Sequence, residues 1–240
     1  MGKSKIEWLQ RPGTIGESWS PVTGCTKIST GCKNCYAERM SKRLAGHCGY
    51  PEAPHQFDVT LHPDKLEQPL KWKKPRTVFV VSMGDLFHID VSIDFIQAVI
   101  NVIAQTPQHT YIILTKRPEE MRNFFFNQIL LDGTFFLRGR YSHNAKSITL
   151  PLPNLWLGAS IEKPKYCYRA QYLRDTPAAV RFISFEPLLA SMSEYPGVLD
   201  DMDWVICGGE SGPGARPMHP DWAQGLRDQC DEAEVPFFFK

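Results

Sequence analysis

The sequence predicts an α/β fold built on a parallel sheet. Short apolar runs rich in β-branched and aromatic residues recur along the chain, and stretches of helical composition separate them. The runs at 77–82 and 111–115 are hydrophobic throughout rather than alternating, which is typical of strands buried on both faces. Such a sheet is either a barrel or a doubly wound sheet, and the periodicity does not distinguish the two.

The expected elements follow one another along a single domain, residues 1–240. Strands are expected at 18–22, 77–82, 111–115, 155–160, 181–185, 204–209 and 236–240. Helices are expected at 36–44, 93–104, 165–174 and 220–233, the last starting at a proline. Two stretches fit this alternation poorly and are interpreted as excursions: 48–76, which is rich in His and Pro, and 124–153.

The composition excludes several classes of protein. The 27 Lys and Arg residues balance 26 acidic residues, so the net charge of +1 gives no global attraction to nucleic acid or membrane. No apolar run approaches the roughly 20 residues of a membrane span, and the N-terminus lacks the apolar core of a secretory signal. We therefore expect a cytoplasmic protein with no membrane partner. The 7 cysteines are then expected to be thiols or metal ligands rather than disulfides.

Three cysteines stand close together in the segment GCTKISTGCKNC. The pair Cys32 and Cys35 can direct two sulfurs at one metal centre, and Cys25 can reach back from the far side of the loop. Gly24 and Gly31 relax the backbone between them. Three protein ligands leave one position open, and on a four-iron cluster the unligated iron can bind a small molecule.

The cysteine pattern alone leaves alternatives open. His47 or Cys48 could complete a structural zinc site, because a C-x2-C pair followed by another ligand about a dozen residues later is ordinary zinc spacing. The thiols could also be unrelated and buried. No role is assigned to Cys167, Cys207 or Cys230.

Five ordered segments resemble a phage-encoded, radical-SAM-like protein family of unknown function with a three-cysteine motif. They are WSPVTGCTKISTGCKNCYAER, SMGDLFH, ILTKRPE, FISFEPLL and VICGGESGPGARPM. The resemblance implies a partial or complete parallel (β/α) barrel of about six to seven strands, with a [4Fe-4S] cluster on Cys25, Cys32 and Cys35. It also implies reductive cleavage of S-adenosylmethionine (SAM) to a 5′-deoxyadenosyl radical. The spacing C-x6-C-x2-C departs from the common C-x3-C-x2-C, which puts the detailed loop geometry in doubt.

Polar residues follow the expected strands, at the edge where parallel barrels bind and react. By the same resemblance, the loop after the second strand contacts the amino group of SAM, which selects Ser82, Gly84 and Asp85. Ser160 and Glu162, after the fourth strand, are then expected at the ribose. For each of these residues the alternative is a solvated loop charge or a salt bridge between strand ends.

The remaining strand ends supply further candidates. Lys116 or Arg117 is expected to meet the carboxylate of SAM, and Glu186 and Lys116 are the candidate catalytic groups, for substrate binding or proton transfer. An ion pair between Glu186 and Lys116 is the alternative. The last glycine-rich loop is expected to contact cofactor or substrate, or to form a phosphate-binding turn with Arg216, and its candidates are Gly208, Gly209 and Glu210.

The expected partners follow from this chemistry. A one-electron donor such as flavodoxin or ferredoxin must reduce the cluster. The LTKRP and GGES segments resemble the spore photoproduct lyase branch of the superfamily, so the substrate is expected to be DNA, RNA or a nucleotide that is repaired or modified. Trp72 and the basic residues of 71–76 could contact nucleic acid, although a solvated surface segment is favoured. The alternative function is a non-catalytic, zinc-stabilised module that binds nucleic acid or protein.

Overall fold

Seven parallel strands form one curled sheet in the computed structural model of the protein, which describes residues 4–128, 134–136 and 147–240. Their order in the sheet is also their order in the chain. The strands are β1 (Ile15–Trp19), β4 (Arg76–Val80), β5 (Thr110–Thr115), β8 (Leu155–Ser160), β9 (Val180–Phe185), β10 (Trp204–Cys207) and β11 (Phe237–Phe239).

This strand order decides between the two folds that the sequence left open. A doubly wound sheet reverses its winding at one strand, whereas a barrel adds each strand to the same edge. Here every strand pairs in parallel with the one before it in the sheet. Among the described residues no ladder joins β11 back to β1, so the sheet is a half-barrel. The predicted parallel α/β barrel is confirmed in its partial form.

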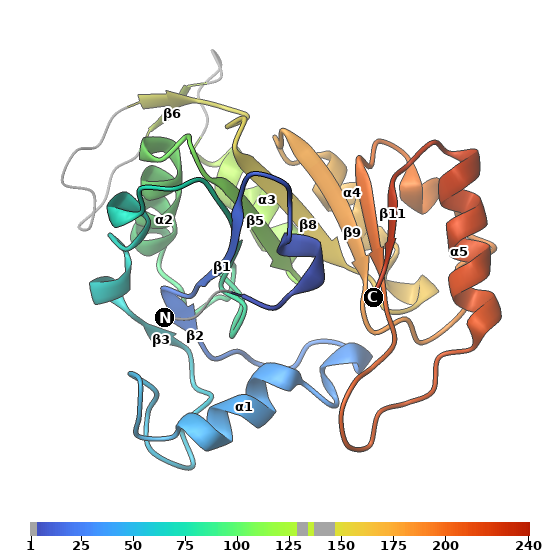
Figure 1. The fold of residues 1–240 in the computed structure, drawn as a ribbon, viewed down its shortest axis with the longest axis horizontal. Helices are drawn as coiled ribbons and strands as arrows, with labels where there is room; N and C mark the ends of the chain where they lie inside the picture. Colours follow the sequence, from blue (N-terminus) through green and yellow to red (C-terminus); the bar gives the residue numbers. More distant parts are fainter. Residues whose placement is uncertain (1–3, 129–133, 137–146) are drawn as a thin grey trace.

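Five helices accompany the sheet in the described part of the chain. They are α1 (Tyr36–Leu44), α2 (Ile93–Gln105), α3 (Pro118–Phe126), α4 (Tyr168–Arg174) and α5 (Pro220–Glu232). Figure 1 shows α2 to α5 outside the curve of the sheet, and α1 below the end at which β11 finishes. Helix α3 was not expected from the sequence, although Pro118 at its first turn and two following glutamates are ordinary signals of a helix start.

Two small two-stranded antiparallel sheets lie outside the main sheet in the described part of the chain. Strand β2 (Val22–Thr23) pairs with β3 (Thr60–Leu61), and β6 (Thr134–Phe136) pairs with β7 (Ser147–Thr149). The first strand of the sheet therefore ends earlier than the expected 18–22, and the chain continues through β2. Strand β3 lies in the expected excursion 48–76, and β6 and β7 lie in the excursion 124–153. Residues 129–133 and 137–146 of the second excursion lie outside the described residues.

The sheet separates two apolar cores. The larger one lies under the helices, and in α2 every residue from Phe95 to Ile103 is buried. The smaller one lies inside the curve, where Trp8 and Leu9 of the short 3-10 helix η1 (Glu7–Leu9) pack on Ile112, Phe182 and Ile206. The N-terminal segment, dark blue in Figure 1, therefore plugs the half-barrel from within.

No described helix combines the length and apolarity that a membrane span needs, since the two longest, α2 and α5, have 13 residues each.

Candidate functional site

The three-cysteine loop, residues 24–35, starts at the carboxyl ends of β1 and β4. Gly24 lies beside Gly84 in a parallel bridge, and its N–H donates to the carbonyl of Met83 at 3.0 Å. Its φ of +83° and the closeness of the Asp58 carbonyl, which would lie 2.1 Å from an added Cβ, leave room for glycine alone. The next residue, Cys25, donates its N–H to the carbonyl of Phe57 at 3.1 Å. The start of the loop is thus fixed by backbone contacts on both sides.

A buried carboxylate supports the middle of this loop. Glu162, with no solvent exposure, accepts a hydrogen bond from Ser29 and is paired with Arg169 at 3.1 Å and Lys116 at 3.6 Å. A Cβ on Gly31 would lie 2.4 Å from its Oε1, so the glycine allows the loop to rest directly on the carboxylate. Glu162 therefore acts through the loop and does not line the cavity beside it.

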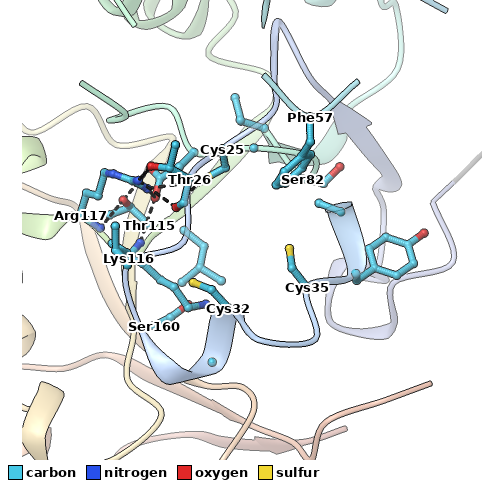
Figure 2. A pocket seen from close by; sticks show the side chains of 18 of the residues that line it. Cys25, Thr26, Cys32, Cys35, Phe57, Ser82, Thr115, Lys116, Arg117 and Ser160 are labelled. Atoms are coloured by element: carbon cyan, nitrogen blue, oxygen red, sulfur yellow. Dashed lines mark hydrogen bonds and ion pairs between the residues drawn. The ribbon is translucent and has the colours of Figure 1, made fainter. Parts of the chain in front are cut away.

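The three thiols line one cavity of about 220 Å³. Figure 2 shows Cys32 and Cys35 on one side of this space, with Ser82 and Phe57 across it. Six of the residues selected from strand ends line the same cavity: Ser82, Gly84, Asp85, Lys116, Arg117 and Ser160. The half-barrel therefore brings most of the candidate cofactor residues to the three cysteines.

A hydrogen-bond network fixes the inner wall of the cavity. Asp85 accepts from the Thr115 hydroxyl at 2.7 Å, from the backbone N–H of Lys116 at 3.1 Å and from the Arg117 guanidinium at 3.3 Å. Arg117 also donates to Thr26 twice, at 2.9 and 3.1 Å, and to Cys25 Sγ at 3.3 Å. Figure 2 shows this network as dashed lines. Asp85 and Arg117 are 5 and 6% exposed, so the pair is protected from solvent.

The surroundings act differently on two of the thiols. Burial raises the pKa of Cys25, the Asp85 carboxylate adds to this effect, and Arg117 opposes it. Burial alone would also raise the pKa of Cys32, but hydrogen bonds from Ser29 and from the backbone near Ile28 outweigh it and lower the pKa. Metal binding requires thiolates, so the loop promotes the ligand form at Cys32, whereas Cys25 depends on Arg117 for stabilisation.

The remaining selected residues lie elsewhere. Glu186 is paired with Lys240 at 2.9 Å and not with Lys116, and neither Glu186 nor the three residues Gly208, Gly209 and Glu210 line the cavity. Glu210 instead holds Arg216 in a salt bridge and accepts from Asn34 Nδ2 at 2.7 Å. These bonds, those from Arg216 first, lower the pKa of Glu210 to about 2, even though partial burial acts in the opposite direction.

Further contacts join the 208–216 loop to the cysteine loop. Arg216 donates to the carbonyl of Thr30 at 3.0 Å, and Asn34 donates to that of Gly214 at 2.9 Å. Arg39 of α1 reaches the carbonyl of Ser211 at 2.9 Å. The glycine-rich loop therefore holds the cysteine loop in place, and we call these contacts the clasp. The Arg216 guanidinium already donates its hydrogen bonds to Glu210 and Thr30.

The three thiols are the side chains of this cavity that could hold a metal centre. Within the described residues no three His, Cys, Asp or Glu side chains converge closely enough to hold one metal ion. His47 and Cys48, either of which could complete the alternative zinc site, do not line the cavity. A four-iron cluster binds each thiolate at a different iron, which spreads the three sulfurs around a larger group. Three cysteines that face a shared cavity, all unpaired in disulfides, fit that requirement.

Sequence reasoning missed several residues that build the site. His88 is buried and hydrogen-bonded to Thr26 at 2.8 Å. The buried Arg169 fixes Glu162, and His62 hydrogen-bonds Thr23 beneath the loop. His219 caps α5 locally, and His143 lies outside the described residues. No local pattern marks His88 and His62, because their partners Thr26 and Thr23 are 62 and 39 residues away in the chain.

The basic segment before β4 lies at the opposite end of the sheet. Arg76 opens β4 at its amino end, stacks on the Trp72 ring at 4.8 Å and pairs with Glu17. Trp72 itself packs on the large core and on His109. The favoured interpretation as an ordinary surface segment agrees with this packing.

Solved structures of spore photoproduct lyase share this fold. One, complexed with dinucleoside spore photoproduct, has a TM-score of 0.56 and 11% identity and covers 100% of this chain and 81% of that chain. A mutant with bound AdoMet and dinucleoside spore photoproduct gives a TM-score of 0.56, 11% identity and coverage of 100% and 79%. At this identity the likeness concerns the fold alone. The protein thus shares the half-barrel fold of the spore photoproduct lyases.

The particular family follows from the sequence. The chain belongs to the family described as "Protein of unknown function (DUF5131)", which matches residues 3–240. No curated protein matches the chain significantly. The family description leaves the activity open.

Proposed function

We propose that this protein is a radical SAM enzyme, with Cys25, Cys32 and Cys35 as the ligands of a [4Fe-4S] cluster. The observation that carries the proposal is that three thiols and six strand-end residues line one cavity. The fold of the spore photoproduct lyases supports it. A cluster bound there would supply the electron that cleaves SAM to methionine and a 5′-deoxyadenosyl radical.

Different residues of the cavity are suited to different groups of SAM. Ser82 Oγ lies 3.4 Å from Ser20 Oγ, at the limit of hydrogen bonding, so it can still accept from an ammonium group. Lys116 is about one quarter exposed at the cavity and provides a cation for the carboxylate. The Ser160 hydroxyl lies at the end of β8 and is suited to a ribose hydroxyl. Asp85 keeps this wall in place through its three neighbours.

The electron comes from outside the chain, and we assign its entry to the surface formed by α1 and the cysteine loop. Residues 27–43 contain five cations and one carboxylate, whereas the whole chain is nearly balanced. The carboxylate, Glu38, is already paired with Lys27 at 2.8 Å. This surface complements an acidic carrier such as a flavodoxin or ferredoxin.

For the substrate we propose a nucleic acid base or nucleotide that is modified or repaired, which would suit the phage setting implied by the sequence resemblance. The support is the fold shared with a lyase whose solved complexes contain a dinucleoside photoproduct. Cleavage of SAM does not require the substrate to be known, so the cofactor chemistry can be tested first.

The test is anaerobic reconstitution with iron and sulfide, followed by reduction with dithionite in the presence of SAM. We expect brown protein with four irons and 5′-deoxyadenosine as a product, with and without added DNA or RNA. Cys32→Ala should lose the cluster and the product, whereas the core variant Cys230→Ala should keep both. Colourless protein with one tightly bound zinc would instead support the binding module.

A further inference from the structure

Arg117 occupies an unusual position for a residue expected to bind SAM. It is the residue before α3, and its backbone N–H is fixed by the Thr115 hydroxyl at 2.8 Å. Its guanidinium is 6% exposed and reaches the first cysteine of the loop. Both ends of the residue are thus held by the protein.

The hydrogen bonds of Arg117 leave little for a ligand. Nη1 donates to Cys25 Sγ and to Asp85, and Nη2 donates to the carbonyl and the hydroxyl of Thr26. These four bonds use all four N–H groups on the two terminal nitrogens. A SAM carboxylate could bind here only by displacing one of them, whereas Lys116 next to it lines the cavity and has a longer ion pair, 3.6 Å to Glu162.

The Thr26 hydroxyl aims the guanidinium from the other side. His88 Nδ1 accepts from the backbone N–H of Asp90 at 3.2 Å, so the hydrogen lies on Nε2, which donates to Thr26 Oγ1 at 2.8 Å. Thr26 Oγ1 therefore accepts from both His88 and Arg117. The direction of Arg117 is determined by groups that belong to three segments of the chain.

We propose that Arg117 is a positioning residue that raises the reduction potential of the cluster through its hydrogen bond to Cys25 Sγ. This inference rests on the proposed function. Hydrogen bonds to ligating sulfurs and nearby positive charge favour the reduced state, which carries one more electron. Loss of the guanidinium would also leave the Asp85 carboxylate without its ion-pair partner beside the site. Its negative charge would then disfavour the reduced state and lower the potential further.

The test is a redox titration of reconstituted protein, followed by EPR in the absence of SAM. In Arg117→Met we expect the equilibrium constant for one-electron reduction to fall at least tenfold, which is about 59 mV toward more negative potential. Arg117→Lys keeps the charge but cannot form the same four bonds, so we expect a smaller shift of the same sign. Arg122→Met is the matched control, because it removes the same group from α3 at a position that pairs with Asp175 and does not line the cavity.

The outcomes are distinguishable from failure of the proposed function. Wild-type protein that takes up no four-iron cluster refutes the function before any variant is compared. Variants that hold the cluster with a potential equal to that of the wild type overturn the role of Arg117. If Arg117→Met takes up no cluster, Arg117→Lys decides the matter, and an unchanged potential in that variant counts against the proposal.

Discussion

The contacts between the 208–216 loop and the cysteine loop allow us to predict how a substitution of Glu210 changes the free energy of unfolding. We expect Glu210→Gln to destabilise the protein at neutral pH, because the neutral amide cannot pair with Arg216 and would place an N–H₂ group among donors. The fall in the pKa of Glu210 from 4.5 to about 2 corresponds to about 3.4 kcal/mol at 1.36 kcal/mol for each unit of pKa. The loop lies near the surface, where solvent screens charges, so we expect about 1–2 kcal/mol.

The sign of the pH dependence follows from the lowered pKa. Because the pKa of Glu210 is lower in the folded state, its carboxylate stabilises the fold fully above pH 4.5, the unfolded value. This stabilisation is lost as the pH falls toward about 2. Urea unfolding at pH 7 and at several points below pH 5 measures this contribution. The difference between wild type and Glu210→Gln should shrink as the pH falls through that range. A matched control is Glu67→Gln, at an exposed position, which should change little. A Glu210→Gln protein as stable as the wild type at pH 7 would refute the reasoning.

Three further predictions concern other parts of the structure. Gly24→Ala should destabilise the fold by about 2 kcal/mol or more, because of its positive φ and the adjacent carbonyl, whereas Gly225→Ala, in open space on α5, should stabilise it by up to about 1 kcal/mol in the same urea assay. Trp8→Ala should cost about 3–5 kcal/mol in the same assay, and near-wild-type stability would mean that the N-terminal plug does not support the sheet. Lys42→Glu should slow reduction by an acidic flavodoxin severalfold at low salt and converge with wild type at high salt in stopped-flow measurements, and an equal effect of Lys73→Glu, at the far end of the sheet, would contradict the assigned surface.

The parts of the fold that could be predicted from sequence are those with local signals. Continuous apolar runs mark the central strands because both of their faces are covered, by helices outside and by the plug inside. The cysteine loop could also be predicted, because its three cysteines lie in one short segment of the chain. Helix α3 was not predicted, and its last turn was assigned to the excursion at 124–153. Three consecutive phenylalanines are not strong helix formers, and here tertiary packing of Phe124 and Phe125 overrides that preference.

The supports of the site could not be predicted in the same way. Glu162 and Ser29 are 133 residues apart, and Glu210 and Asn34 are 176 apart, so each pair becomes visible only when the sheet is assembled. Both carboxylates were selected as cofactor-binding groups at strand ends, and neither lines the cavity. Their placement shows that such a group can act on the cysteine loop instead of facing the cavity.

The ion pairs at the strand ends show what information was lacking. The sequence suggested that Glu186 could pair with Lys116, but these residues follow β9 and β5, and β8 lies between those strands. Lys116 instead reaches Glu162, which follows the adjacent β8, and Glu186 reaches Lys240, which follows β11, across the intervening β10. One strand separates Glu186 from each of the two lysines, so the order of the strands leaves both pairs open. The choice between them is a property of the folded sheet, in which Lys116 pairs with the buried Glu162 beside the cysteine loop.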